Sequence, residues 1–290
     1  MSTNLPKTNL ALIFRYGREA LGNRRKDLLL ITVIFILAPN LLAYLAWQST
    51  AIQAVDALNS LTNTPAITEI ESLFATVSSL IVAPSLAFGV LKILGILTLA
   101  RSCVDYFESR PGSIGSVISR AGRVLLTKGL GVVLILIIIS PVIFLMPFLR
   151  ALAMSMLVML PVTLVAGGNG GLRTTWETIF LKYATTTSFG RWPVFINVLS
   201  VTGIFLTALF GVSLLIDQIS VLDTIFEMPA GILDKTISIP GIQMNAGLLI
   251  SGLMNLIWES FAITMIIPFT AAIYHLSTAP SDHVPFSTNA

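Results

Sequence analysis

The basic residues of this chain occupy alternate gaps between long apolar runs. Of the 17 Lys and Arg, 14 fall around three such gaps, namely Lys7, Arg15, Arg18, Arg24, Arg25 and Lys26, then Arg101, Arg110, Arg120, Arg123 and Lys128, then Arg173, Lys182 and Arg191. The intervening gaps hold acids: 48–71 contains no Lys or Arg, and 217–245 contains four acids and one Lys. Because short loops rich in Lys and Arg stay cytoplasmic, this alternation predicts an even number of membrane crossings with both termini cytoplasmic.

The composition agrees with a membrane protein. The 290 residues are 55% hydrophobic and only 11% charged, with a mean hydropathy of +0.89, whereas soluble domains carry about 25% charged residues. Several runs reach the roughly 20 apolar residues that a helix needs to cross the hydrocarbon core. They are continuously apolar, without the alternation that a barrel strand requires. The predicted fold class is therefore all-α, a polytopic transmembrane helix bundle.

Six spans are predicted within a single membrane domain that covers 1–290. Their ranges are 28–47, 73–100, 124–148, 151–166, 194–216 and 246–274. Residues 1–27 are expected to form a cytoplasmic amphipathic helix, 217–245 an external loop and 275–290 a cytoplasmic tail. The first apolar run follows Arg24, Arg25 and Lys26 as a signal sequence does, but it is about as long as a full span, so we expect it to be retained.

Apolar side chains recur with helical spacing in each cytoplasmic segment that precedes an odd-numbered span. The three stripes are Leu10, Ile13, Phe14, Gly17 and Leu21, then Ile114, Val117, Ile118, Ala121 and Leu125, then Trp176, Ile179, Phe180 and Tyr183. This spacing predicts three interfacial helices with their apolar faces in the acyl boundary. Their basic residues are expected to contact lipid headgroups: Arg15, Arg18, Arg120, Arg123, Arg173 and Lys182.

The first two stripes also share sequence letters. Residues 13–21 match residues 118–126 at the Ile, Arg, Gly, Arg and Leu positions, and a proline follows in each apolar run, at Pro39 and Pro141. One interpretation is three repeated units, each an interfacial helix followed by a transmembrane hairpin. The alternative is chance similarity between two basic amphipathic helices.

Two ionisable residues fall well inside predicted spans, Lys92 in 73–100 and Glu259 in 246–274. At about 1.5 Å per residue, both lie about 20 Å from the outer ends of their spans, so they are natural partners. Trp258 precedes Glu259, and its indole N–H should find a partner within the bundle. The functional interpretation is a proton-coupled, ion-coupled or headgroup site. The structural interpretation is an ion pair between two spans, or a Lys that reaches toward headgroups.

Several function classes are disfavoured. The net charge of +3 fits cytoplasmic-side contact with anionic headgroups better than nucleic-acid binding. Cys103 is the single cysteine, and His275 and His283 are too few for a metal or haem site. Nucleophile–base sets, paired carboxylates and a Walker motif are all missing from the sequence. We therefore expect no catalytic residues, metal or cofactor, and no enzymatic activity.

The layout resembles the membrane domain fused to some bacterial glycerophosphodiester phosphodiesterases, and the related YciC-like inner-membrane proteins. The resemblance lies in Arg-Tyr-Gly-Arg-Glu-Ala-Leu at 15–21, Ser-Val-Ile-Ser-Arg-Ala at 116–121, and Leu-Pro-Val at 160–162 running into Gly-Gly-Leu-Arg-Thr-Thr-Trp at 170–176. It implies a standalone membrane domain in the bacterial inner membrane. The catalytic barrel of the phosphodiesterases has no counterpart here, so their activity is not implied.

Two functional hypotheses remain. The first is a non-catalytic module or accessory subunit that engages membrane lipids, a protein partner or a second copy of itself. The alternative is a permease subunit that works with a separate ATPase or an ion gradient.

Overall fold

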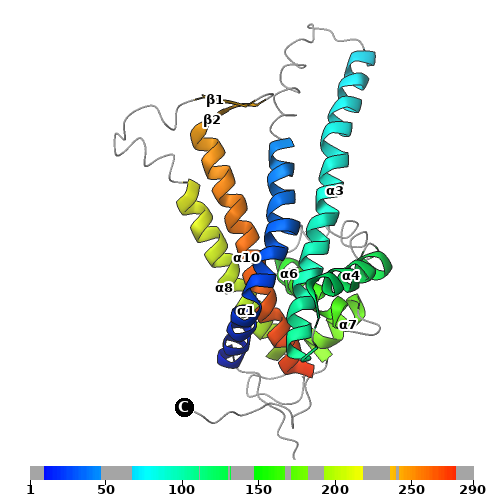
Figure 1. Ribbon diagram of the computed structural model, residues 1–290, viewed down its shortest axis with the longest axis vertical. Coiled ribbons are helices and arrows are strands. Elements are labelled where there is room, and N and C mark those ends of the chain that lie inside the picture. Colours follow the sequence, from blue (N-terminus) through cyan, green and yellow to red (C-terminus); the bar gives the residue numbers. More distant parts are fainter. Residues whose placement is uncertain are drawn as a thin grey trace, which may run out of the picture. The chain divides into compact units, whose positions relative to one another are not determined.

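The structure is a computed structural model that describes residues 10–46, 67–110, 112–129, 131, 147–166, 171–181, 193–217, 236–239 and 242–278. The described chain is helical apart from one two-stranded hairpin (Figure 1). Four of its helical stretches are long and apolar enough to cross a membrane: Leu10–Ala46, Ser85–Phe107, Phe195–Ile216 and Ile250–Thr278. The predicted class of a helical membrane protein is confirmed at this level.

These four stretches overlap the predicted spans 28–47, 73–100, 194–216 and 246–274. The predicted span 151–166 contains a shorter apolar helix, Ser155–Val165. Most of the predicted span 124–148 lies outside the described residues.

The N-terminal amphipathic segment is not a separate helix, contrary to the predicted division into 1–27 and 28–47. Helix α1 (Leu10–Thr32) and the π-helix η1 (Val33–Leu37) belong to one helical stretch, Leu10–Ala46. No proline interrupts residues 10–38, so the hydrogen-bond ladder continues. The π turn ends two residues before Pro39, which lacks an N–H and clashes with the preceding turn in a regular α-helix. The wider turn accommodates this defect.

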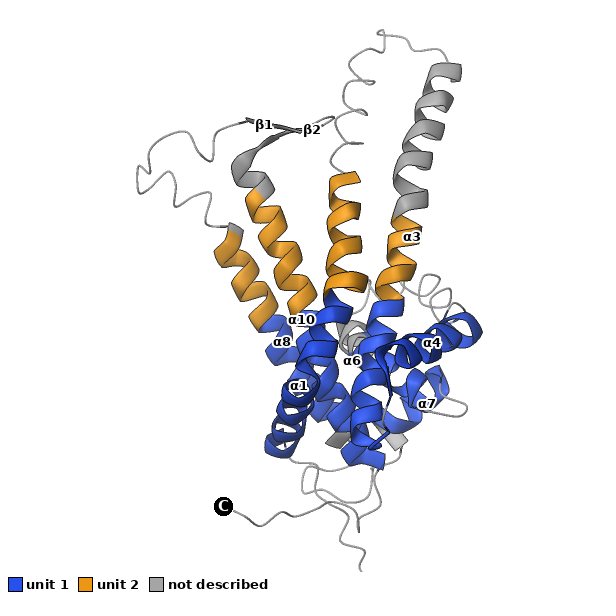
Figure 2. Ribbon diagram, viewed as in Figure 1, with its two compact units in different colours: residues 1–32, 94–207, 262–290 blue, residues 33–93, 208–261 orange. Residues whose placement is uncertain are grey.

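The remaining elements follow in chain order. They are α3 (Ile67–Phe107), α4 (Ile114–Val124), η2 (Leu125–Gly129), α6 (Pro147–Val165), α7 (Leu172–Trp176), η3 (Glu177–Leu181), α8 (Pro193–Asp217), β1 (Thr236–Ile239), β2 (Ile242–Asn245) and α10 (Ala246–Thr278). Strands β1 and β2 pair antiparallel, with Ile239 opposite Ile242, and are the departure from an all-α chain. The chain divides into two compact units, residues 1–32, 94–207 and 262–290, and residues 33–93 and 208–261 (Figure 2).

The core of the first unit forms where α1, α6, α8 and α10 meet. Its fully or nearly buried members are Ile13, Met159, Ile179, Val198, Val201, Phe269, Ile273 and Leu276. Gly17 allows the closest approach in this core, because a Cβ at this position would overlap the ring of Phe269. Phe14 packs on the same ring, with 5.1 Å between the ring centroids. Within the first unit, α1 is therefore fitted against α10.

This packing corrects the predicted orientation of the amphipathic stripes. Ile13 and Gly17 of the first stripe, and Val117 and Ala121 of the second, are buried against protein. Of the third stripe, Ile179 is buried and Trp176 is exposed, while the side chains of Phe180 and Tyr183 lie outside the described residues. Helical periodicity predicts which face is covered, but protein and lipid are equally apolar covers.

Side-chain contacts tie the helices of the first unit together. Asn23 on α1 donates to the hydroxyl of Tyr106 on α3 over 2.8 Å. The ring of Phe107 stacks on His275 of α10 with 4.9 Å between centroids. Short α4 is oriented across α3 in Figure 1, and a Cβ on its Gly122 would lie within van der Waals contact of Leu94. This crossing brings the basic residues of α4 to the C-terminal part of α3.

Candidate functional site

The second unit contains an ion pair between two candidate spans. Lys92 Nζ on α3 lies 2.7 Å from Glu259 Oε1 on α10. The side chains are 29% and 43% exposed, so in a bilayer they would meet lipid or a neighbouring protein. An isolated charge near mid-bilayer costs several kcal/mol, so pairing of the two side chains is strongly favoured. The structure therefore brings together the two charges that depth counting matched.

Trp258 finds the expected partner for its indole N–H within the bundle, but on another helix than the ion pair. Its Nε1 donates to the backbone oxygen of Leu209 on α8 over 3.1 Å. Successive helical residues point about 100° apart, so α10 uses Glu259 toward α3 and Trp258 toward α8. The indole N–H is satisfied, and Trp258 links two helices of the second unit.

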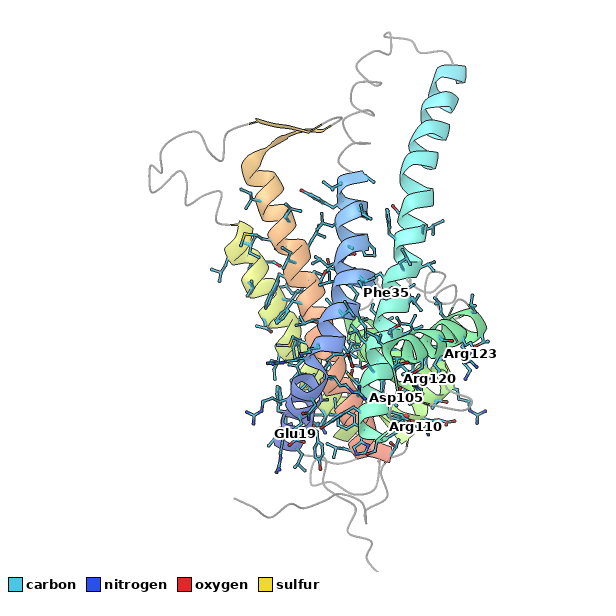
Figure 3. All side chains as sticks on the ribbon, in the orientation of Figure 1. Glu19, Phe35, Asp105, Arg110, Arg120 and Arg123 are labelled. Carbon is cyan, nitrogen blue, oxygen red and sulfur yellow. The ribbon has the colours of Figure 1, made fainter. Side chains whose placement is uncertain are left out.

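The first unit contains a charge cluster built around a buried carboxylate. Asp105 on α3 has a side chain only 1% exposed, and its Oδ1 lies 2.8 Å from Arg101 Nη2 one turn earlier. Its Oδ2 lies 2.8 Å from Arg120 Nη2 on α4. Figure 3 shows Asp105 on α3 beside Arg120 on α4. Two guanidinium groups therefore share one buried negative charge, and α4 is fixed to α3 by that interaction.

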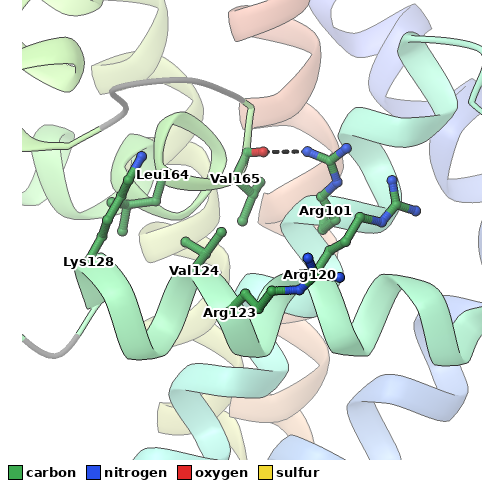
Figure 4. A pocket seen from close by; sticks show the side chains of 7 residues that line it. All are labelled: Arg101, Arg120, Arg123, Val124, Lys128, Leu164 and Val165. Atoms are coloured by element: carbon green, nitrogen blue, oxygen red, sulfur yellow. Dashed lines mark hydrogen bonds between the residues drawn. The ribbon is translucent and has the colours of Figure 1, made fainter.

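Arg101 also closes the end of a neighbouring helix. Its Nη1 donates to the backbone oxygen of Val165, the last residue of α6 (Figure 4). The final carbonyls of a helix lack intrahelical partners and carry the negative end of its dipole, so a cation is well placed there. The side chain of Arg101 is only 9% exposed. A largely buried cation thus serves both the carboxylate of α3 and the end of α6.

A cavity of about 250 Å³ opens beside this cluster. We call it the arginine pocket, and its lining residues are Arg101, Arg120, Arg123, Val124, Lys128, Leu164 and Val165. Figure 4 shows the four cationic side chains coming from α3, α4 and η2, with the apolar residues of α4 and α6 between them. None of the described residues that line it is acidic, and four are cationic, so this lining is strongly positive.

The predicted headgroup residues have different surroundings. Arg15 pairs with Glu19 at 3.2 Å and Arg173 with Glu177 at 2.8 Å, both one helical turn apart and on the surface. Arg18 and Arg123 are exposed, and Lys182 lies outside the described residues. Arg120 has a protein partner that the sequence did not predict, because its guanidinium pairs with Asp105 while its side chain stays 31% exposed.

Sequence reasoning missed Arg101 and Asp105. The predicted span ended at Ala100, which placed both residues in a loop, whereas α3 continues to Phe107. Their i, i+4 spacing was the available signal, since opposite charges at that spacing share a helix face. The third partner, Arg120, is 15 residues further along and is brought in by the crossing of α4.

Among the described residues, no three or more His, Cys, Asp or Glu gather where they could hold a metal ion. What the geometry offers chemically is fixed positive charge in the first unit and a neutralised charge pair in the second. No protein-family model, curated protein or solved structure matches this chain.

Proposed function

We propose that this chain is a non-catalytic multi-pass protein of the bacterial inner membrane whose basic side engages anionic lipid headgroups. The proposal includes six spans, both termini in the cytoplasm and three repeated helix-plus-hairpin units, in line with the resemblance to standalone YciC-like membrane domains. On this account the protein acts as a lipid-engaging module or as an accessory subunit of a membrane complex.

The observation that carries this proposal is exposed positive charge at the surface of α1. Arg18, Arg25 and Lys26 are exposed in the described structure, directly before the apolar part of the same helical stretch. Basic residues at that junction meet the anionic leaflet, where each contributes about 1 kcal/mol of attraction. The apolar stripe of α1 packs against protein, but the basic residues project from the other face of the helix. They can therefore still meet the anionic leaflet.

We predict that replacing these three charges lowers the retention of anionic lipid. The variant R18Q/R25Q/K26Q loses about 3 kcal/mol of headgroup attraction by the same arithmetic. Mass spectrometry of lipid retained through purification in mild detergent is expected to show a lower ratio of phosphatidylglycerol to phosphatidylethanolamine. The charge-conserving variant R18K/R25K/K26R serves as the control and should retain the wild-type ratio. An unchanged ratio in the neutralised variant would refute lipid engagement by α1.

A permease subunit is the second candidate function, favoured by the Lys92–Glu259 pair within two candidate spans. Intramembrane ion pairs occur along ion and proton pathways as well as in structural roles. Co-purification separates the two candidates. A stoichiometric ATPase whose activity the protein stimulates supports transport, whereas enriched anionic lipid without an ATPase supports the lipid-engaging module.

A further inference from the structure

We propose that the arginine pocket binds a phosphate group. This inference rests on the proposed engagement of anionic headgroups and deepens it by naming the site and the ligand class. The phosphate belongs either to a phospholipid headgroup or to a free phosphate anion, two sources that present the same chemistry to the pocket. Four cationic side chains, two apolar helix ends and a suitable volume support the assignment.

The charge of the pocket favours an anion. Arg101, Arg120, Arg123 and Lys128 line it, and Arg101 and Arg120 contact the carboxylate of Asp105, which lies outside the lining. Among the described residues, the one Asp105 charge is set against the charges of Arg101, Arg120 and Arg123, which leaves a surplus of positive charge facing the cavity. Closely spaced cations repel one another, and an anion between them relieves that repulsion. A doubly charged phosphate monoester or a phosphodiester supplies negative charge that the lining does not.

Two of the four cations are held in place before a ligand enters. Arg101 is fixed by Asp105 and by the backbone oxygen of Val165. Arg120 is fixed by Asp105 and by a 3.3 Å hydrogen bond from its Nε to the backbone oxygen of Ser116. Planar guanidinium groups bind phosphate oxygens through paired hydrogen bonds, and prior fixation lowers the entropy lost on binding.

The size and walls of the pocket restrict the ligand further. A volume of about 250 Å³ lies just below the range of about 300–1,000 Å³ for larger small-molecule sites, which suits a phosphate with a short polar attachment. Val124, Leu164 and Val165 supply apolar surface beside the cations. Such a mixed lining fits a headgroup with the first carbons of its glycerol, and it also admits inorganic phosphate.

The test uses the full chain in nanodiscs. In discs of phosphatidylcholine, inorganic phosphate is titrated against chloride of equal ionic strength, and thermal unfolding is recorded. In discs that include phosphatidylglycerol, the lipid held by the protein is measured by mass spectrometry after extraction. Stabilisation by inorganic phosphate identifies free phosphate as a ligand, and selective retention of phosphatidylglycerol identifies the lipid headgroup.

The decisive comparison is between two exposed arginines of the same unit. Arg123→Gln removes a pocket charge, whereas Arg110→Gln removes a charge outside the lining that pairs with Glu108 at 3.3 Å. We expect R123Q to lower affinity for the phosphate-bearing probe about fivefold, the equivalent of about 1 kcal/mol, with a further loss in R123Q/K128Q. R110Q should stay within about twofold of wild type, a range set by the small contribution of exposed ion pairs. The charge-conserving R123K/K128R should retain binding, which separates loss of charge from loss of fold.

Equal responses of R123Q and R110Q overturn the pocket assignment. A wild-type protein that responds neither to inorganic phosphate nor to phosphatidylglycerol overturns it as well. These failures are distinguishable from failure of the proposed function. If R18Q/R25Q/K26Q releases phosphatidylglycerol while R123Q changes neither lipid retention nor the response to inorganic phosphate, lipid engagement stands and the pocket does not. If inorganic phosphate binds at the pocket but no variant changes lipid retention, the pocket stands and the lipid function does not.

Discussion

Asp105→Asn is expected to destabilise the protein by about 3–5 kcal/mol, the usual cost of removing one partner from a buried ion pair. The amide keeps the volume of the side chain but leaves Arg101 and Arg120 without their shared negative charge. Asp105 is 1% exposed, so water cannot replace the lost interaction. The free energy of unfolding in mixed detergent micelles measures this loss.

Glu108→Gln provides the matched control for this prediction. It removes the same charge three residues later in the chain, from a carboxylate that pairs with exposed Arg110 at 3.3 Å. Exposed ion pairs contribute about 0–1 kcal/mol, so a small effect is expected. Equal destabilisation by D105N and E108Q would show that the cluster does not hold α4 against α3.

Glu259→Gln is expected to destabilise the protein by about 2.5–3.5 kcal/mol, the cost of an uncompensated Lys at the centre of a membrane helix. The single variant leaves Lys92 without the carboxylate 2.7 Å from its Nζ. The double variant K92M/E259Q removes both charges and is expected to recover most of the stability, because an apolar replacement of an ion pair is often neutral. A double-mutant cycle in nanodiscs measures the coupling.

The same variants separate the structural role of the pair from a transport role. Restored stability with wild-type lipid binding in K92M/E259Q supports a structural pair between α3 and α10. Restored stability with loss of a transport activity would favour the permease hypothesis. If E259Q and K92M each leave stability unchanged, the pair does not stabilise the fold.

The sequence was most informative where a pattern is local or depends on the membrane. Long apolar runs mark the four candidate spans directly, because length and hydropathy are properties of neighbouring residues. Counting residues from the span ends also matched Lys92 with Glu259, since the bilayer gives two distant segments a common depth scale. Helical periodicity identified the buried faces around Ile13 and Val117.

The sequence was least informative where the outcome depends on how helices cross. Each apolar stripe was predicted to face lipid. Gly17 of the first stripe instead packs on Phe269, which is 252 residues away in the chain. The cluster of Asp105 with Arg101 and Arg120 requires both the extension of α3 past residue 100 and the crossing of α4. Arg120, which the sequence assigned to headgroups, pairs with the buried carboxylate of Asp105. Counting charges does not distinguish a basic residue that pairs with a carboxylate from one that faces lipid.

The arginine pocket follows from this same arrangement. Asp105 holds two guanidinium groups side by side, and the pocket forms where they meet the end of α6. The carboxylate of Asp105 therefore positions two of the cations that a phosphate in the pocket would meet.

Membrane sidedness is the central claim, and site-specific cysteine labelling in intact cells tests it most directly. Native Cys103 is buried and is first replaced by Ala, after which single cysteines are placed by Ser113→Cys, Ser188→Cys, Thr62→Cys and Ser220→Cys. A membrane-impermeant thiol reagent is expected to label positions 62 and 220 from outside and to reach 113 and 188 only after the membrane is permeabilised. Labelling of 113 and 188 from opposite sides would contradict the six-span arrangement and the common basic face proposed here.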